Sequence, residues 1–345
     1  MNKIIDIIIP AYKAQDTIDR TLSSIAEQSI VDKIKVTIVN DKDGIGYSKH
    51  IKRFKGLVDI DEVVLRKNGG PGVARQIGLS KTTAPYVTFI DADDTFYNAF
   101  AVQIMLAHLT ENPKTAVSVG QFTEQKFKDR LDFLVHNQDA IWMFGKMYKR
   151  DFLNKYHIQF NTTRSNEDTG FNAIVNLCAN ENEHIKYYET LVYIWWYKED
   201  SITRINDHEY SYNQSFIGYT ENMIYAINHV RYVQPFNSNV DIKAIQVMAS
   251  LYVYLLKTKF RDKRFLEQNF GWCKIYYDTI FKDVMDRIPQ EHIIKIVTAQ
   301  VSGEYAGIRD ILVDMTFYEF LDMLEKEEVK EEEIKEEESE EVENE

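Results

Sequence analysis

Apolar and polar residues follow two alternating patterns over the first third of the chain. Short continuous apolar runs, typical of strands buried on both faces, lie at residues 4–10, 35–41, 62–66 and 86–91. Apolar residues at helical spacing lie between and after these runs, at residues 16–28, 47–54, 73–81 and 99–109. Strands that alternate with helices in this way predict an α/β fold with a doubly wound, mostly parallel, Rossmann-like sheet.

The pattern changes twice further along the chain. Residues 115–122, 143–149 and 190–197 indicate more strands, around a helix that starts at Glu167, whereas residues 208–325 indicate several helices rich in aromatic and aliphatic residues. We therefore expect domains at residues 1–205 and 206–324, followed by a tail at 325–345. Aromatic side chains of the second domain are expected mainly in its core, although they could also stack on sugar rings.

The net charge of −13 is concentrated at the end of the chain. Residues 325–345 hold thirteen Glu and three Lys, a net charge of −10, so the preceding 324 residues carry only −3. This body lacks the basic surplus that binds nucleic-acid phosphates, which argues against a nucleic-acid acceptor. The separated Cys178 and Cys273 predict neither a disulfide framework nor a zinc cluster and favour a cytoplasmic location. No apolar run reaches the roughly 18 residues of a transmembrane segment.

Three aspartates accompany the fourth expected strand. Asp91 ends it, and Asp93 and Asp94 follow directly. Because alternate residues of an extended segment point the same way, Asp91 and Asp93 could converge on one divalent cation that holds a phosphate ester. The alternative is that the three aspartates cap the N-terminus of the following helix. For Asp94 taken alone, capping and metal binding are equally plausible roles. A second DxD pair, Asp59 and Asp61, is expected to be merely solvated, in a loop before a strand.

Further polar candidates face the same edge of the sheet. Asp41 follows the second expected strand and could accept from a nucleobase N–H or a ribose hydroxyl, or could simply stabilise the turn NDKDG. The turn NGGPG at residues 68–72 could bring the backbone close to a ligand, although neither GxGxxG nor GxxxxGK[ST] is present. Arg75, in the next helix, could neutralise a diphosphate. Taken alone, an arginine there is more typical of the surface.

Glu167 and Asp168 open an amphipathic helix after a polar loop. A carboxylate at a helix N-terminus beside a cleft can take a proton from an incoming hydroxyl. The alternative is a structural role, because Asp and Glu in a first turn offset the helix dipole.

Together these segments resemble the family 2 glycosyltransferases, which have the GT-A fold. The resemblance covers about residues 4–205 and rests on IIIPAYKAQDTIDRTLSSIAEQ, IVND, NGGPGVARQIGL, YVTFIDADD, FGKMYKRDFLNKYHIQF, SNEDTGFN and YKEDSITR, in that order. It implies a GT-A domain and a C-terminal, mainly helical domain for acceptor binding or homo-oligomerisation. It also implies metal-dependent, inverting transfer of a hexose from a UDP-sugar to a hydroxyl of a glycan, a teichoic-acid-like polymer or another biopolymer.

The resemblance implies roles at the matching positions. Asp93 would bind Mn²⁺ or Mg²⁺, with Asp91 beside it and His208 as a candidate third ligand. Asp168 would be the general base, and Glu167 would support the acceptor. Nucleotide-sugar binding would involve Pro10, Ala11, Tyr12, Asp41, Asn68, Arg75, Asp91, Ala92, Ser201 and Arg204. Lys13, Gln15 and Lys42 depart from the family's usual residues near the base and sugar, whereas the carboxylates are intact.

Two other classes of protein are alternatives to a glycosyltransferase. A nucleotidyltransferase would need a Gly-rich triphosphate loop near the first strand, and PAYKAQDT is not such a loop. A non-catalytic module that binds a nucleotide sugar or a glycan is the remaining alternative. The presence of both Asp93 and Asp168 argues against it.

Overall fold

The structure is a computed structural model that describes residues 3–179, 184–199, 215–256, 263–305 and 315–326. The chain divides into two compact units, one made of residues 1–207 and 228–236 and the other of residues 208–227 and 237–345. Helix α8 (Ser215–Val233) contributes residues to both units. The domain boundary expected near residue 205 lies outside the described residues, as does most of the acidic tail.

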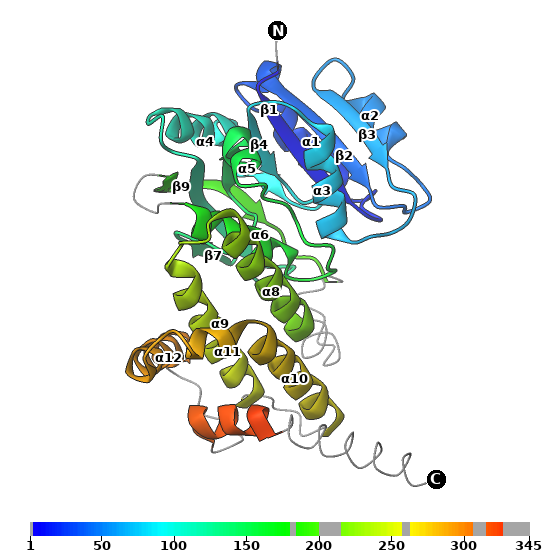
Figure 1. The fold of residues 1–345 in the computed structure, drawn as a ribbon. Helices are drawn as coiled ribbons and strands as arrows, with labels where there is room; N and C mark the ends of the chain where they lie inside the picture. Colours follow the sequence, from blue (N-terminus) through cyan, green and yellow to red (C-terminus); the bar gives the residue numbers. More distant parts are fainter. Residues whose placement is uncertain (1–2, 180–183, 200–214, 257–262, 306–314, 327–345) are drawn as a thin grey trace, which may run out of the picture. The chain divides into compact units, whose positions relative to one another are not determined.

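The first unit is built on a nine-stranded mixed sheet with the strand order β3-β2-β1-β4-β8-β6-β9-β5, to which β7 is added by pairing with β6 (Figure 1). The parallel half consists of β1 (Ile5–Ala11), β2 (Ile34–Asn40), β3 (Asp59–Val64) and β4 (Tyr86–Phe89). β1, β2 and β4 correspond to the apolar runs, because strands that are covered on both faces need continuous apolar sequence. The edge strand β3 begins three residues before its expected run, and its side chains are exposed or half-buried. Asp59 and Asp61 lie in β3 itself, so the expectation of a loop there is wrong, although both are exposed as expected.

The other half of the sheet is mostly antiparallel. It contains β5 (Thr95–Phe96), β6 (Val117–Gln125), β7 (Phe133–His136), β8 (Lys146–Lys149) and β9 (Ile185–Trp195). β8 runs antiparallel to both β4 and β6, whereas β9 runs parallel to β6. The sheet is thus a parallel Rossmann-like half continued by a mixed half.

Helices connect the strands and cover the sheet. They are α1 (Ile18–Ala26), α2 (Ser48–Arg53), α3 (Pro71–Lys81), α4 (Ala101–Thr110), α5 (Arg150–Lys155) and α6 (Glu167–Cys178), with a 3-10 turn η1 at Val31–Lys33. Pro71 occupies the first turn of α3, where its missing N–H leaves no helical bond unmade. Helix α3 contacts β1, β2 and α6, and therefore joins the parallel strands to the helix that starts at Glu167.

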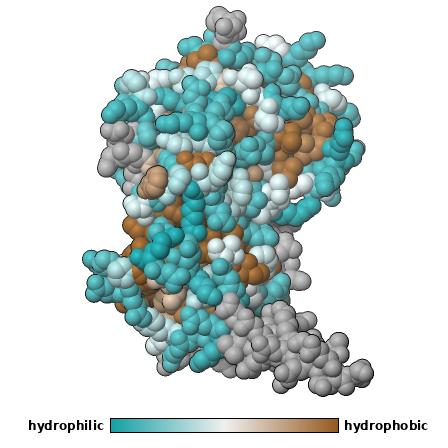
Figure 2. Space-filling model, in the orientation of Figure 1, coloured by the Kyte–Doolittle hydropathy of each residue, from teal (hydrophilic) through white to brown (hydrophobic). Residues whose placement is uncertain are grey.

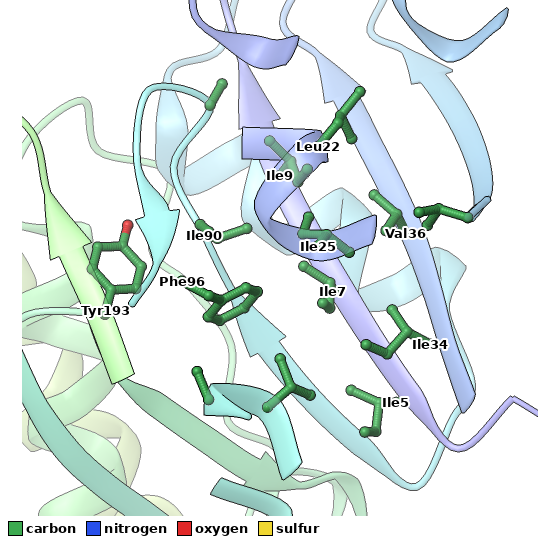
Figure 3. Close-up of a cluster of buried hydrophobic side chains, with 14 of the residues drawn as sticks. Ile5, Ile7, Ile9, Leu22, Ile25, Ile34, Val36, Ile90, Phe96 and Tyr193 are labelled. Carbon is green, nitrogen blue, oxygen red and sulfur yellow. The ribbon is translucent and has the colours of Figure 1, made fainter. Parts of the chain in front are cut away.

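The core of the first unit lies between β1 and its neighbouring helices. Ile5, Ile7 and Ile9 are alternate residues of β1, and Figure 3 shows them beside Leu22 and Ile25 of α1. All five are completely buried. Each such side chain contributes roughly 1.5–3 kcal/mol relative to an exposed one. This packing fixes β1 and so the strand ends that lie at the candidate site.

The second unit is helical in its described residues. It contains α9 (Asn239–Leu256), α10 (Lys263–Tyr276), a π-helical turn η3 (Tyr277–Phe281), α11 (Lys282–Met285) and α12 (Gln290–Tyr305). Helix α9 is central, because it contacts α10, η3, α11 and α12. Phe216, Tyr276 and Tyr277 are buried, which confirms a core position for these aromatic residues.

The cysteines and the surface add little to what the sequence already indicates about function. Cys178 and Cys273 are buried free thiols. Figure 2 shows a face on which hydrophilic residues predominate and apolar residues form smaller patches. Within the described residues, no helix is both long enough and apolar enough to cross a membrane.

Candidate active site

Three parallel strands end at one edge of the sheet. Ala11 closes β1, Asp41 follows β2, and Asp91 lies just beyond β4. The Asp41 N–H donates to the Ala11 carbonyl over 2.8 Å, which extends the pairing of β1 and β2 to the edge itself. Ligands of α/β sheets bind outside the carboxyl ends of parallel strands. Pro10 and Ala11 belong to β1, whereas Tyr12 lies beyond it and is 46% exposed.

Asp41 anchors the glycine-rich turn. Its carboxylate oxygens accept hydrogen bonds from the Gly69 N–H over 2.7 Å and the Gly70 N–H over 2.8 Å, and its carbonyl accepts from the Asn68 side-chain amide. Gly70 has a φ of +88°, which favours glycine, and a Cβ there would lie 3.3 Å from Arg164 Cγ. The buried Asp41 carboxylate therefore shapes the turn. Its contact with a nucleobase stays a prediction.

Arg75, on α3, joins two carboxylates from distant parts of the sequence. Its Nη2 lies 2.7 Å from Asp91 Oδ1, and its Nη1 lies 2.5 Å from Glu167 Oε1. The side chain is only 6% exposed, so the expectation of a surface position, drawn from Arg75 alone, is wrong. A planar guanidinium can hold two carboxylates in a fixed relation, and here it connects the end of β4 to the start of α6.

The local sequence explains where α6 begins. Asn166 has a left-handed φ of +57°, which asparagine tolerates better than most residues, and Glu167 and Asp168 follow as the first helical residues. The start of α6 also lies very close to α3. A Cβ at Gly72 would lie 2.8 Å from the Asn161 carbonyl oxygen and 3.0 Å from Glu167 Cβ, so glycine permits this approach.

Burial raises the pKa of both carboxyl groups at the start of α6. For Glu167, burial outweighs the opposing charge of Arg75, the charge of Asp168 adds to it, and the pKa is raised to about 7. Burial also raises the pKa of Asp168, against Arg75 and a hydrogen bond of 2.7 Å from the Thr169 N–H. Asp168 keeps part of its surface exposed, whereas Glu167 is 5% exposed. Asp168 is therefore the more accessible of these two strengthened bases.

The aspartates after β4 have different surroundings. Asp94 is buried and accepts from the Tyr193 hydroxyl over 2.7 Å and from the Trp196 N–H over 3.0 Å. It thereby fastens this segment to β9, and it does not cap α4, which begins at Ala101. Asp91 and Asp93 both have side chains that are 29% exposed. Of the three, only Asp91 and Asp93 are open to a ligand.

Asp93 also has a basic neighbour that the sequence did not single out. Its Oδ2 lies 3.0 Å from Lys198 Nζ, and its carbonyl accepts from Arg20 Nη2 over 2.5 Å. In the part of the chain that the structure describes, no three His, Cys, Asp or Glu side chains are grouped to hold a metal ion. The carboxylates of Asp91 and Asp93 nevertheless suit Mg²⁺ or Mn²⁺, which commonly complete their coordination with phosphate oxygens and water.

The other predicted site residues lie in different places, and three of them lie outside the described residues. Asn68 lies in the turn held by Asp41, and Arg164 Nη1 donates to its Oδ1 over 2.9 Å. Ala92 is buried between Asp91 and Asp93. Ser201, Arg204 and His208 lie outside the described residues. Sequence reasoning does not find Lys198, although this residue stands in the segment YKEDSITR beside Ser201 and Arg204.

Comparisons with known proteins agree with the arrangement of sheet and helices. The crystal structure of Staphylococcus aureus TarS residues 1–349 in complex with UDP-GlcNAc has a TM-score of 0.65 at 17% identity, over 91% of this chain and 95% of that chain. This likeness establishes a fold of the GT-A glycosyltransferase class. Residues 6–166, which lie in the first unit, match the family model described as Glycosyl transferase family 2.

Curated relatives match over longer stretches at low identity. The poly(ribitol-phosphate) β-N-acetylglucosaminyltransferase TarP of Staphylococcus aureus (strain N315) is 24% identical over 84% of this chain and 90% of its own length. The uncharacterized glycosyltransferase EpsJ of Bacillus subtilis (strain 168) is 23% identical over 59% of this chain and 64% of its own length. The match therefore spans less than two thirds of EpsJ but most of TarP.

Proposed function

We propose that this chain transfers a hexose from a UDP-sugar, with inversion, to hydroxyl groups of a teichoic-acid-like polymer, assisted by a divalent cation. The observation that carries the proposal is the pair of contacts made by Arg75. These contacts place Asp91 and Glu167 in one hydrogen-bonded set. Asp91 would lie next to the diphosphate, and Glu167 precedes Asp168 in the helix. Such a set holds donor-binding and proton-accepting groups in a fixed relation, which favours reaction between two bound substrates.

Asp168 is the general base in this proposal. Its carboxylate accepts the proton of the acceptor hydroxyl while that oxygen attacks the anomeric carbon opposite the departing UDP. A single displacement of this kind inverts the anomeric configuration. The raised pKa of Asp168, caused by burial, supports this role because it makes the carboxylate a stronger base at neutral pH.

Asp93 and Asp91 are the residues that would hold Mn²⁺ or Mg²⁺. Both side chains are partly exposed, and both offer hard oxygen donors of the kind that these ions prefer. A cation there would offset the charge of the departing diphosphate. The neighbouring Asp94 has no such role, since its carboxylate is buried against Tyr193 and Trp196.

The substrates are proposed from the relatives. TarP is described as acting on poly(ribitol-phosphate), and its match extends over most of both chains. The TarS crystal structure contains UDP-GlcNAc. We therefore expect a UDP-linked donor, with UDP-GlcNAc the first to test, and a polyol-phosphate acceptor.

The test is a transfer assay on the purified chain. UDP-GlcNAc, UDP-glucose and UDP-galactose are each combined with poly(ribitol phosphate) or poly(glycerol phosphate), and UDP release is followed with Mn²⁺ and with EDTA. Asp93→Asn is compared with Asp61→Asn as a matched control. Asp61 belongs to the other DxD pair, on the edge strand β3, where it forms an exposed ion pair with Lys35.

The expected result is acceptor-dependent UDP release that EDTA and Asp93→Asn abolish and Asp61→Asn preserves. NMR of the product should show inversion at the anomeric carbon. UDP binding without release from any donor would instead favour the non-catalytic binding module. Release that EDTA and Asp93→Asn leave unchanged would refute the proposed metal dependence.

A further inference from the structure

A buried lysine lies near the start of α6. Lys146, the first residue of β8, is 2% exposed. Its Nζ lies 3.1 Å from Asp139 Oδ1 and also donates to the Trp142 carbonyl. Lysine is almost never fully buried unless it is paired, because removing its charge from water is costly. Both of these partners are acceptors, which favours the charged ammonium form.

The loop that holds Lys146 is also fixed to α6. Asn172 Nδ2 donates to the Ile141 carbonyl over 2.7 Å and to the Trp142 carbonyl over 3.2 Å, and Asn176 Nδ2 donates to the Ala140 carbonyl over 3.0 Å. Residues 168, 172 and 176 are four positions apart and share one face of the helix. The Trp142 carbonyl therefore connects the Lys146 ammonium directly to the helix that carries Asp168.

Asp168 experiences charges from several elements. Arg75 of α3 and Lys146 of β8 favour its carboxylate form, whereas Asp91 at the end of β4 disfavours it. Glu167, on its own helix, is a further acidic neighbour. The charge of Arg75 is shared between Asp91 and Glu167, to which it is hydrogen-bonded. Lys146 has one carboxylate partner among the described residues, Asp139, and its charge adds to the larger effect of Arg75 on Asp168.

The charge interaction is reciprocal. Burial lowers the pKa of Lys146, and the carboxylates of Asp139 and Asp168 oppose that effect. Each of Lys146 and Asp168 thus stabilises the ionised form of the other. No direct hydrogen bond between them is needed for this effect, because charges interact strongly where water is largely excluded.

We propose that Lys146 is a positioning residue for Asp168: its buried charge keeps Asp168 ionised, and its hydrogen bonds hold the loop at residues 139–142 against α6. The proposal rests on the proposed function, in which Asp168 accepts the proton of the acceptor hydroxyl. Lys146 itself touches neither substrate. Its effect should therefore appear in the pH dependence of turnover more than in donor binding.

The test compares two substitutions that separate charge from hydrogen bonding. Lys146→Gln removes the charge and keeps an amide that can donate, whereas Lys146→Arg keeps the charge. For each variant, kcat and the donor KM are measured from pH 5 to pH 9 alongside thermal unfolding. Arg150→Gln is the matched control, because Arg150 is a second buried cation whose Nη2 lies 2.8 Å from Asp6 Oδ2, near the start of β1.

In Lys146→Gln, the acidic limb of the kcat profile should move to higher pH by on the order of one unit, as expected when an opposite charge is lost. The loss at low pH should recover at pH 9, and the donor KM should change little. Lys146→Arg should keep the wild-type midpoint. Arg150→Gln should lower the melting temperature without moving the midpoint.

An equal loss of kcat at every pH in Lys146→Gln would overturn the proposal, because it would mean a structural role alone. If Lys146→Gln does not fold, Lys146→Met provides the same comparison with an apolar side chain of similar length. Failure of the proposed function is distinguishable, since the wild-type chain would then transfer no sugar at any pH.

Discussion

Arg75 and Glu167 are 92 positions apart in the chain, yet Arg75 Nη1 lies 2.5 Å from Glu167 Oε1. Both side chains are less than a tenth exposed, and Arg75 also binds Asp91. The two helices α3 and α6 are thereby joined at the edge of the sheet where the candidate site lies. Removing the guanidinium would leave two poorly solvated carboxylates without their partner.

Arg75→Met should therefore lower the free energy of unfolding by about 3–5 kcal/mol, the usual cost of breaking a buried ion pair from one side. Transfer should fall by about 100-fold or more, because Asp91 and Asp168 would lose their fixed relation. Urea denaturation and initial rates measure the two effects. Arg66→Met, at an exposed arginine of the same region, is the control and should change neither. A fully active Arg75→Met protein would contradict the role assigned to this contact.

Asp41→Asn should loosen the glycine-rich turn. The two carboxylate oxygens of Asp41 each accept from one glycine N–H, and the amide NH2 group that replaces one oxygen in asparagine cannot accept. Each hydrogen bond to a charged group is worth about 1.5–3 kcal/mol. We expect faster amide exchange at Gly69 and Gly70 together with weaker binding of UDP, measured by NMR and calorimetry. Unchanged exchange with weakened UDP binding would instead mean that Asp41 acts on the nucleotide directly.

Glu167 should make stability fall as the pH rises. Its pKa is about 7 in the folded chain against an ordinary value of 4.5, so between these values the folded state binds the additional proton. The stability that protonated Glu167 contributes is thus complete below about pH 4.5 and is lost by about pH 7. Over this window the free energy of unfolding of the wild type should decline more steeply than that of Glu167→Gln, by up to ~1.4 kcal/mol per pH unit. If urea denaturation gave the same decline of the free energy of unfolding with pH for the wild type and for Glu167→Gln, the raised pKa of Glu167 would be contradicted.

Lys198 should compete with a metal ion for Asp93. Its Nζ lies 3.0 Å from Asp93 Oδ2, and a cation on that carboxylate must displace or weaken the ion pair. Lys198→Gln should therefore reach half-maximal transfer at a lower Mn²⁺ concentration than the wild type, as measured by Mn²⁺ titration of the rate. Lys128→Gln, which alters an exposed ion pair with Glu199, is the control. A higher Mn²⁺ requirement in Lys198→Gln would mean that Lys198 assists the metal-bound donor instead.

The parallel half of the fold could be predicted from the sequence because β1, β2 and β4 are continuous apolar runs, whereas the start of the edge strand β3 (DIDEVV) could not. The short strands β5 and β7 could not. Thr95–Phe96 is too short to show a pattern, and Phe133–His136 follows the charged stretch KFKDRLD. β5 forms through pairing with β9, which is distant in sequence, whereas β7 forms through pairing with the preceding strand β6. Local propensity carries little information about either pairing.

The sequence names candidate site residues, but it does not indicate the contacts between them. Context favoured Asp91 and Asp93 over Asp59 and Asp61, and the structure places Asp91 and Asp93 just beyond β4 and the other two on the edge strand β3. The burial of Arg75 could not be foreseen, because it depends on the packing of α3 against α6. Lys146 was missed for a related reason: in FGKMYK a lysine between apolar residues is typical of the exposed face of a strand, and only the loop at 139–142 makes it a buried charge.

The most direct test of the central claim is the transfer rate of Asp168→Asn at saturating donor, measured beside its affinity for UDP. The substitution preserves the shape of the side chain and removes its ability to take a proton. We predict that transfer falls by ~10²–10⁴-fold, the usual contribution of a general base, while UDP binds as it does to the wild type. Transfer at the wild-type rate by a folded Asp168→Asn protein would show that another group accepts the proton.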